Sequence, residues 1–133
     1  MYQLRKIFIL TLILGFNTAF CQDKSSCTVY LIRPGTESLD GFLDGAKIKI
    51  EINDTLKLKL KYRTYIKLNL NEGAFKIDYD EKTIQQTLED GKTYYFSFSF
   101  KAKWGRMVYA TEVPPESGQK ELTVIDNRKK RKK

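Results

Sequence analysis

From residue 28 onward, apolar and polar side chains alternate with a period of two, which predicts strands that bury one face. In residues 47–52, for example, three isoleucines alternate with two lysines and a glutamate. The expected strands are 28–33, 47–52, 56–61, 65–70, 75–79, 83–88, 94–100 and 106–113. Turn signals every eight to twelve residues are typical of an antiparallel sandwich or barrel. We expect an all-β fold, a single antiparallel β-sandwich of seven to eight short strands.

The strand at 94–100 is the expected centre of the core. Tyr94, Phe96, Phe98 and Phe100 share one of its faces. Burying most of these rings contributes on the order of 2–3 kcal/mol each before entropy is subtracted. The strand at 83–88 is polar and rich in threonine and glutamine, so we expect it at a sheet edge.

The pattern weakens after the two prolines at 114 and 115. We expect one short helical turn at 116–122, no assignment for 123–127, and a disordered basic tail from residue 128. Together with the leader described next, the expected domains are a signal peptide at 1–21, a short segment at 22–26, a β-sandwich at 27–122, and a C-terminal extension at 123–133.

Residues 1–21 have the three parts of a secretory signal peptide. A basic pair is followed by an apolar run at 7–16 and then by smaller residues ending at Cys21. The run is about half of the roughly 20 residues that a membrane-spanning helix needs. We expect cleavage after Cys21 and a periplasmic or secreted protein. Lipoprotein anchoring at Cys21 is the less favoured alternative, because Phe20 and Thr18 do not suit that processing site.

The net charge of +8 in 133 residues comes from the two ends of the chain. Two of the 24 basic residues lie in the leader and six at the C-terminus. The remaining 16 balance the 16 acidic residues, which all lie between Gln22 and Asn127. Only the tail can therefore attract an anionic membrane or polymer. The residues expected to do so are Arg128, Lys129, Lys130, Arg131, Lys132 and Lys133.

The composition excludes several kinds of site. The chain has no histidine and two cysteines, so it can form no His-dependent catalytic triad, no His-ligated metal site and no disulfide framework. We expect no cofactor, metal or disulfide to be needed for folding. If Cys21 leaves with the leader, Cys27 is the remaining thiol. We favour a small, semi-buried residue at the start of the first strand; the alternatives are an intermolecular disulfide and a redox-active thiol.

Acidic residues gather in or beside two predicted turns, with Asp78, Asp80 and Glu81 at one and Glu89 and Asp90 at the other. Acidic side chains often occur in turns because they hydrogen-bond the local backbone. The alternatives are a carboxylate pair for glycoside hydrolysis and a calcium site, but the spacing matches no EF-hand loop. We favour the turn role.

Aromatic side chains lie beside cations in two stretches, 62–67 and 101–106. Such pairs can stack on sugars or bases beside a cation. Because we expect an exported protein, we favour an envelope protein, peptide or glycan as partner and expect no nucleic acid. Arg33 is expected mainly to tie the strand ends together. The possible ligand contacts are Trp104, Arg106, Tyr62, Tyr65 and Arg33.

The order of several motifs resembles domain-of-unknown-function family 2846. The motifs are the Tyr-x-x-Arg-Pro strand at 30–34, the Asn-Glu-Gly turn at 71–73 with the strand after it, and the Gly-Lys-x-Tyr-Tyr start at 91–95. The resemblance covers about residues 27–122 and implies an exported bacterial β-sandwich with no assigned activity. Phe75 stands where many relatives place histidine.

Two functions are compatible with these observations. We favour a non-enzymatic binding or accessory module of the bacterial cell envelope. The alternative is an envelope glycan hydrolase whose carboxylate pair is unidentified. The absence of histidine and of nucleophile motifs favours the first.

Overall fold

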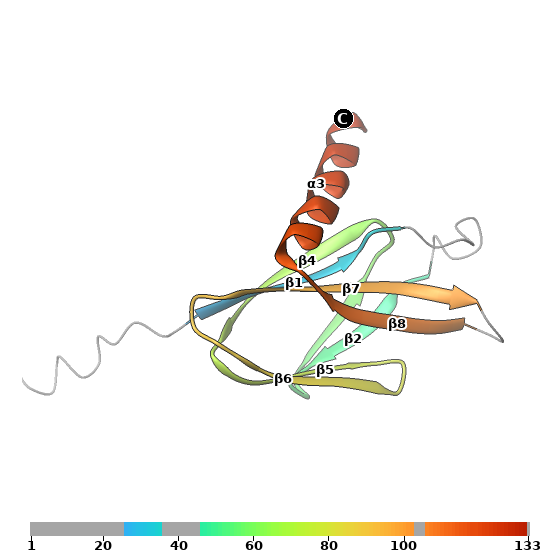
Figure 1. The fold of residues 1–133 in the computed structure, drawn as a ribbon. Coiled ribbons are helices and arrows are strands. Elements are labelled where there is room, and N and C mark those ends of the chain that lie inside the picture. The colour runs from blue at the N-terminus through green and yellow to red at the C-terminus, as the bar shows by residue number, and fades with distance from the viewer. Residues whose placement is uncertain (1–25, 36–45, 103–105, 133) are drawn as a thin grey trace, which may run out of the picture.

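The computed structural model describes residues 26–35, 46–102 and 106–132, which form two four-stranded sheets and one helix (Figure 1). The first sheet has the order β4-β1-β7-β8 and the second β3-β2-β5-β6. The first contains β1 (Ser26–Arg33), β4 (Thr64–Asn71), β7 (Thr93–Ala102) and β8 (Arg106–Val113). The second contains β2 (Ile48–Ile52), β3 (Leu56–Leu60), β5 (Gly73–Tyr79) and β6 (Lys82–Leu88). The expected mostly-β fold is confirmed.

The expectation of purely antiparallel sheets is wrong in one place. β1 and β7 run parallel, with Thr28 opposite Thr93 and Ile32 opposite Ser97. The chain leaves the first sheet after β4, forms β5 and β6 in the second sheet, and re-enters beside β1 in the same direction. A period of two shows which face of a strand is buried but not the direction of its neighbour. The predicted edge position of 83–88 is confirmed, because β6 ends the second sheet.

The main core lies between the two sheets and contains the aromatic face predicted for β7. Phe96 and Phe98 are fully buried, and Tyr94 and Phe100 pack against the same cluster while partly buried. The ring of Phe98 meets Tyr79 from the second sheet edge-on, with 5.7 Å between ring centroids. Aromatic contacts across the two sheets therefore join the layers.

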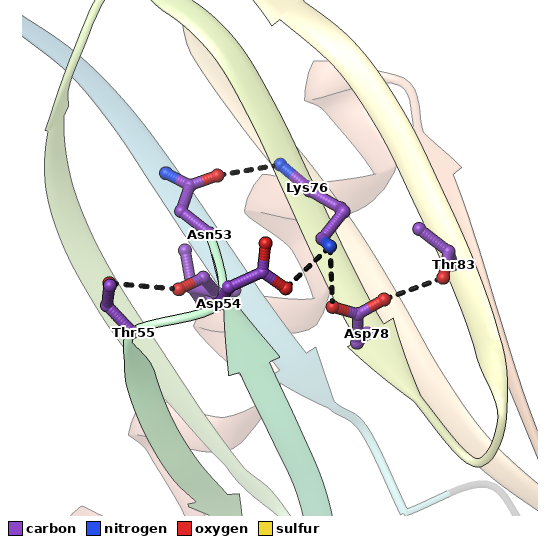
Figure 2. A network of polar contacts seen from close by, with 7 residues as sticks. Asn53, Asp54, Thr55, Lys76, Asp78 and Thr83 are labelled. Atoms are coloured by element: carbon purple, nitrogen blue, oxygen red, sulfur yellow. Dashed lines mark hydrogen bonds and ion pairs between the residues drawn. The ribbon is translucent and has the colours of Figure 1, made fainter.

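Charged and polar side chains fasten the β2–β3 turn to the neighbouring strand β5 (Figure 2). Asn53 and Asp54 both have positive φ, a conformation that Asn and Asp adopt more readily than most residues. The Asn53 side-chain oxygen accepts a hydrogen bond of 2.9 Å from the Lys76 backbone N–H. The Lys76 ammonium lies 2.5 Å from Asp54 and 3.4 Å from Asp78. Thr83, which donates to Asp78, and then Lys76 hold the pKa of the Asp78 carboxyl below its ordinary value.

The largest correction concerns the C-terminus. Residues expected as one turn, an unassigned stretch and a disordered tail instead form α3 (Pro115–Arg131). Pro115 suits the first helical turn because a proline has no N–H to leave unpaired there. Four cations lie in the last turn, at the negative end of the helix dipole, and this placement stabilises the helix. Lys133 lies outside the described residues.

The helix is stable because it packs on part of the outer face of the first sheet, against β7, β1 and β4, on the side away from the second sheet (Figure 1). Ile125 is buried against Ile32 and Tyr95, whose side chains point away from the main core. Tyr30, Tyr65, Val113 and Leu122 surround this contact, partly buried. The molecule therefore has three layers, and the helix completes a second, smaller core.

Close approach of α3 to the sheet depends on Gly118. A Cβ atom at this position would overlap ring and Cβ atoms of Tyr95, which is itself buried. On helix propensity alone, Gly118→Ala should stabilise the protein by about 1 kcal/mol. We instead expect it to lower the free energy of unfolding by about 1–3 kcal/mol, because overpacking outweighs propensity.

Urea unfolding measures this difference, with Ser117→Ala as the matched control. Ser117 is the exposed neighbour in the same turn, so its replacement should be neutral or slightly stabilising. A stabilising Gly118→Ala would contradict the packing of α3 on Tyr95.

Candidate functional site

A basic hollow of about 500 Å³ lies between the β3–β4 turn and the last two turns of α3. The turn brings its residues to one end of the first sheet, where the helix ends. The hollow is lined by Tyr62, Arg63, Thr64, Ile125, Arg128, Lys129, Arg131 and Lys132. Residues more than 60 positions apart in the sequence thus form one surface.

The turn side of the hollow is held by local hydrogen bonds. The Tyr62 hydroxyl donates to the Gly35 carbonyl oxygen at 3.2 Å, and the Thr64 hydroxyl donates to the Lys61 carbonyl oxygen at 2.7 Å. Arg63 has φ of 54°, in the left-handed region that allows the chain to reverse between β3 and β4. Its guanidinium lies 4.9 Å from the centroid of the Tyr62 ring.

The helix side is held by contacts to the first sheet and to the segment after β1. Arg128 Nη1 donates to the Pro34 carbonyl oxygen at 3.5 Å. Lys129 Nζ lies 5.0 Å from the centroid of the Tyr65 ring. Two of the four cations in this wall are therefore positioned by the fold, and Arg131 and Lys132 are exposed.

Tyr65 connects the helix to an aromatic cluster on the sheet. Its hydroxyl donates to Asp126 Oδ1 at 3.1 Å. Burial, followed by the hydrogen bond to Asp126, raises the pKa of the Tyr65 phenol above its ordinary value. Tyr30 meets Tyr65 edge-on and stacks on Tyr95, with centroid distances of 6.0 and 5.3 Å. These rings form the floor on which α3 lies.

The charge of the hollow is strongly one-sided. Of the described residues that line it, five are cations and none is a carboxylate. Arg128 is followed by Arg131 three positions later and by Lys132 four positions later, so like charges are neighbours on the helix surface and repel. An anion in the hollow would relieve this repulsion. The chemistry that this site offers is anion binding.

Arg33 makes its hydrogen bonds inside the fold. Its side chain is fully buried, so a ligand at the protein surface cannot contact it. The guanidinium donates to the carbonyl oxygens of Ala46 and Leu60 and lies 4.9 Å from the centroid of the Phe100 ring. It also lies 5.4 Å from the Tyr62 ring, so it supports one wall of the hollow from inside.

The other predicted contacts are only partly placed. Tyr62 lines the hollow, and Tyr65 lies beneath α3 next to it. Trp104 lies outside the described residues, and so does the side chain of Arg106, whose backbone begins β8. The proposed second aromatic and basic stretch is therefore not placed relative to the hollow.

Three of the five carboxylates considered for catalysis or calcium binding have local partners. Asp80 accepts a hydrogen bond of 2.9 Å from the Val108 backbone N–H and links the β5–β6 turn to β8. Asp78 interacts with Lys76 and Thr83, and Glu89 forms an ion pair with Lys92. Within 26–35, 46–102 and 106–132, no three Cys, Asp or Glu side chains gather closely enough to hold a metal ion.

Sequence reasoning did not single out Arg63 or Ile125. Arg63 belongs to the aromatic and basic stretch at 62–67, and its place beside Tyr62 was the available signal. Ile125 follows Gly118 and Leu122 at intervals of seven and three residues, the spacing of one helix face. That pattern contains few apolar residues, so it gave only a weak helix signal.

No family model, curated protein or solved structure matches the chain. The resemblance to family 2846 therefore stays a prediction. In the part of the chain that the structure describes, no helix has the length and apolar character needed to cross a membrane.

Proposed function

We propose that this protein is a non-enzymatic binding or accessory module of the bacterial cell envelope that attaches to an anionic partner through the basic hollow. The observation that carries the proposal is the gathering of five cations, with no carboxylate among the described lining residues, at one end of the fold. The predicted signal peptide supports an envelope location. The formally neutral body of the chain would not oppose the attraction.

The anionic partner is a membrane surface rich in acidic lipids. Each Lys or Arg near such a surface contributes about 1 kcal/mol, and this contribution falls as salt is added. The cations of α3 lie on a helix that is docked to the sheet, and not on a disordered tail. They therefore act together on one side of the molecule. Adhesion should therefore depend on where the charges lie as well as on their number.

Co-sedimentation with vesicles tests this proposal, using the chain from residue 22 onward as the expected mature form. The vesicles contain phosphatidylglycerol mixed with phosphatidylcholine, or phosphatidylcholine alone. The test variant replaces Arg128, Lys129, Arg131 and Lys132 with glutamine. Removing four cations takes away at most about 4 kcal/mol of attraction to the acidic vesicles. Because each cation need be only partly engaged, we expect the variant to lose at least tenfold in affinity. Substitution is preferable to truncation after Asn127, since residues 128–131 complete α3.

The matched control removes the same number of charges elsewhere. Lys47, Lys49, Lys57 and Lys59 are exposed on or beside the second sheet, away from the hollow. Their replacement with glutamine should weaken vesicle binding much less. Equal loss in both variants would show that net charge alone matters. Failure of the unmodified chain to bind acidic vesicles would overturn the proposed function.

A further inference from the structure

We propose that the basic hollow is a discrete binding site for a phosphate ester, in which Arg63 from the β3–β4 turn and the arginines of α3 hold the phosphate group from two sides. This inference rests on the proposed function, because it assumes that the hollow binds an anion. It goes further in naming the chemical class of the ligand and in giving Arg63 a direct role. The alternative is a diffuse basic surface in which every cation counts equally.

The kinds of cation favour phosphate. Three of the five cations that line the hollow are arginines: Arg63, Arg128 and Arg131. A guanidinium presents a planar fork of N–H donors that matches two phosphate oxygens, whereas an ammonium acts as a point charge. Arg63 is contributed by a turn 65 positions away from Arg128 in the sequence. Forks from two separate elements can enclose a tetrahedral anion in a way that one helix face cannot.

The turn and the helix that form the two walls of the hollow are held in place before a ligand arrives. On the turn side, the Tyr62 hydroxyl is bonded to the Gly35 carbonyl oxygen, and the Arg63 guanidinium lies over the Tyr62 ring. On the helix side, Ile125 is 1% exposed and anchors α3 to the first sheet. A preorganised site binds more tightly because less conformational entropy is lost on binding.

The hollow is large enough for a ligand bigger than an inorganic ion. Its volume of about 500 Å³ lies within the range of roughly 300–1,000 Å³ that is usual for small-molecule sites. The half-buried Tyr62 ring lines the hollow beside the cations, with the Arg63 guanidinium 4.9 Å and the Arg33 guanidinium 5.4 Å from its centroid. A phosphate ester with a short uncharged group, such as a glycerol or sugar phosphate, fits this combination. That chemistry occurs both in lipid headgroups and in soluble phosphorylated molecules.

Binding should also stabilise the last turns of α3. Arg128, Arg131 and Lys132 repel one another there, and a bound dianion would offset this repulsion because the five cations of the hollow outweigh the roughly half negative charge at the C-terminal end of the helix dipole. A ligand that binds only the folded state raises the melting temperature in proportion to the logarithm of its concentration above Kd. Phosphate stabilises folded proteins in general because it is excluded from their surface, so the specific effect is the part of the stabilisation that saturates and that Arg63→Gln removes.

The experiment titrates glycerol 3-phosphate into the chain from residue 22 onward at constant ionic strength, and measures heat release and melting temperature. We expect saturable binding with one ligand per chain. Arg63→Gln should weaken this binding at least tenfold. Lys130→Gln removes one positive charge from an exposed position of α3 that does not line the hollow. The affinity of this variant for glycerol 3-phosphate should change less than twofold.

Arg63→Lys separates the geometry of the fork from its charge. A discrete phosphate site predicts a loss of at least threefold in affinity for this variant, whereas a diffuse basic surface predicts none. Arg63→Lys also keeps a long cationic side chain at this position of positive φ. It therefore serves as a second test if Arg63→Gln does not fold. Equal effects of Arg63→Gln and Lys130→Gln, or a glycerol 3-phosphate response no larger than that of chloride, would overturn the inference.

The same variants identify the source of the phosphate. If a lipid headgroup is bound, Arg63→Gln should weaken adhesion to phosphatidylglycerol vesicles, and glycerol 3-phosphate should compete with those vesicles. If the ligand is soluble, Arg63→Gln should lose glycerol 3-phosphate binding and keep vesicle adhesion. Vesicle adhesion that persists without any phosphate site leaves the proposed function standing while rejecting this inference.

Discussion

Replacing Phe98 with alanine should lower the free energy of unfolding by about 3–5 kcal/mol. Phe98 is fully buried in the middle of β7, and its ring lies 5.7 Å from Tyr79 of the opposite sheet at an interplanar angle of 86°. Removing the ring leaves a cavity between two sheets whose backbones are fixed by hydrogen bonds, so the site can collapse only partly. Denaturation with urea, followed by tryptophan fluorescence and circular dichroism, measures the loss.

Two further variants show whether this loss reflects the core. Phe98→Leu retains part of the volume and should cost less than Phe98→Ala. Val124→Ala removes apolar atoms from an exposed position of α3, where the side chain is 43% exposed, and should change stability by less than about 0.5 kcal/mol. A near-neutral Phe98→Ala would mean that the face assigned to the core is not the buried one.

The buried face of β7 could be predicted because the pattern that encodes it is local. Side chains alternate between the two faces of any strand, so four aromatics at every second position specify a face without knowledge of the neighbours. The turn at Asn53 and Asp54 was also predictable, since these residue types adopt positive φ at low cost. The burial of Phe98 and the turn at Asn53 are thus features that a few neighbouring residues determine.

The parallel pairing of β1 with β7 could not be predicted in the same way. Thr28 and Thr93 are 65 positions apart, and nothing in either strand fixes the direction of its partner. The burial of Tyr95 could not be predicted either, because it depends on a contact with a distant segment. On alternation alone Tyr95 belongs to the solvent face with Ser97, but α3 covers it.

The helix was missed because its stability comes from tertiary contacts. Few apolar residues lie between 115 and 131, and helices in water are marginal unless one face packs against a partner. Gly118, Leu122 and Ile125 form that face only because Tyr95 and Ile32 are available beneath it. The cations after residue 127 were therefore predicted as a disordered tail.

The site was predicted as two separate features. Tyr62 and Tyr65 were expected as ligand contacts, and the terminal cations as an independent adhesive tail. The path of α3 across the first sheet brings Arg128 and Lys129 to the β3–β4 turn. Since that path depends on the docking of the helix, the hollow could not be derived from either segment alone.

Ile125→Ala should lower the free energy of unfolding by about 2–5 kcal/mol, or by the smaller free energy of helix docking if α3 detaches alone. Ile125 is the apolar centre of the contact between α3 and the first sheet, where it meets Ile32 and Tyr95. Its loss opens a cavity under the helix and weakens the positioning of Asp126 at the Tyr65 hydroxyl. Urea unfolding measures the stability. The pKa of Tyr65, followed by nuclear magnetic resonance, should fall toward its ordinary value as burial and the Asp126 hydrogen bond are lost.

This substitution changes no charge, so it separates the docked hollow from a simple basic tail. If α3 must be docked to form the phosphate site, Ile125→Ala should reduce the stabilisation by glycerol 3-phosphate while adhesion to acidic vesicles largely remains. That division follows because the four cations of α3 stay clustered on one segment if the helix detaches, whereas a two-sided site also depends on the distance between Arg63 and the helix. Val124→Ala, at the exposed neighbouring position, should leave both measurements unchanged. An Ile125→Ala protein with a full response to glycerol 3-phosphate would show that the helix cations bind without docking and that Arg63 does not share the site.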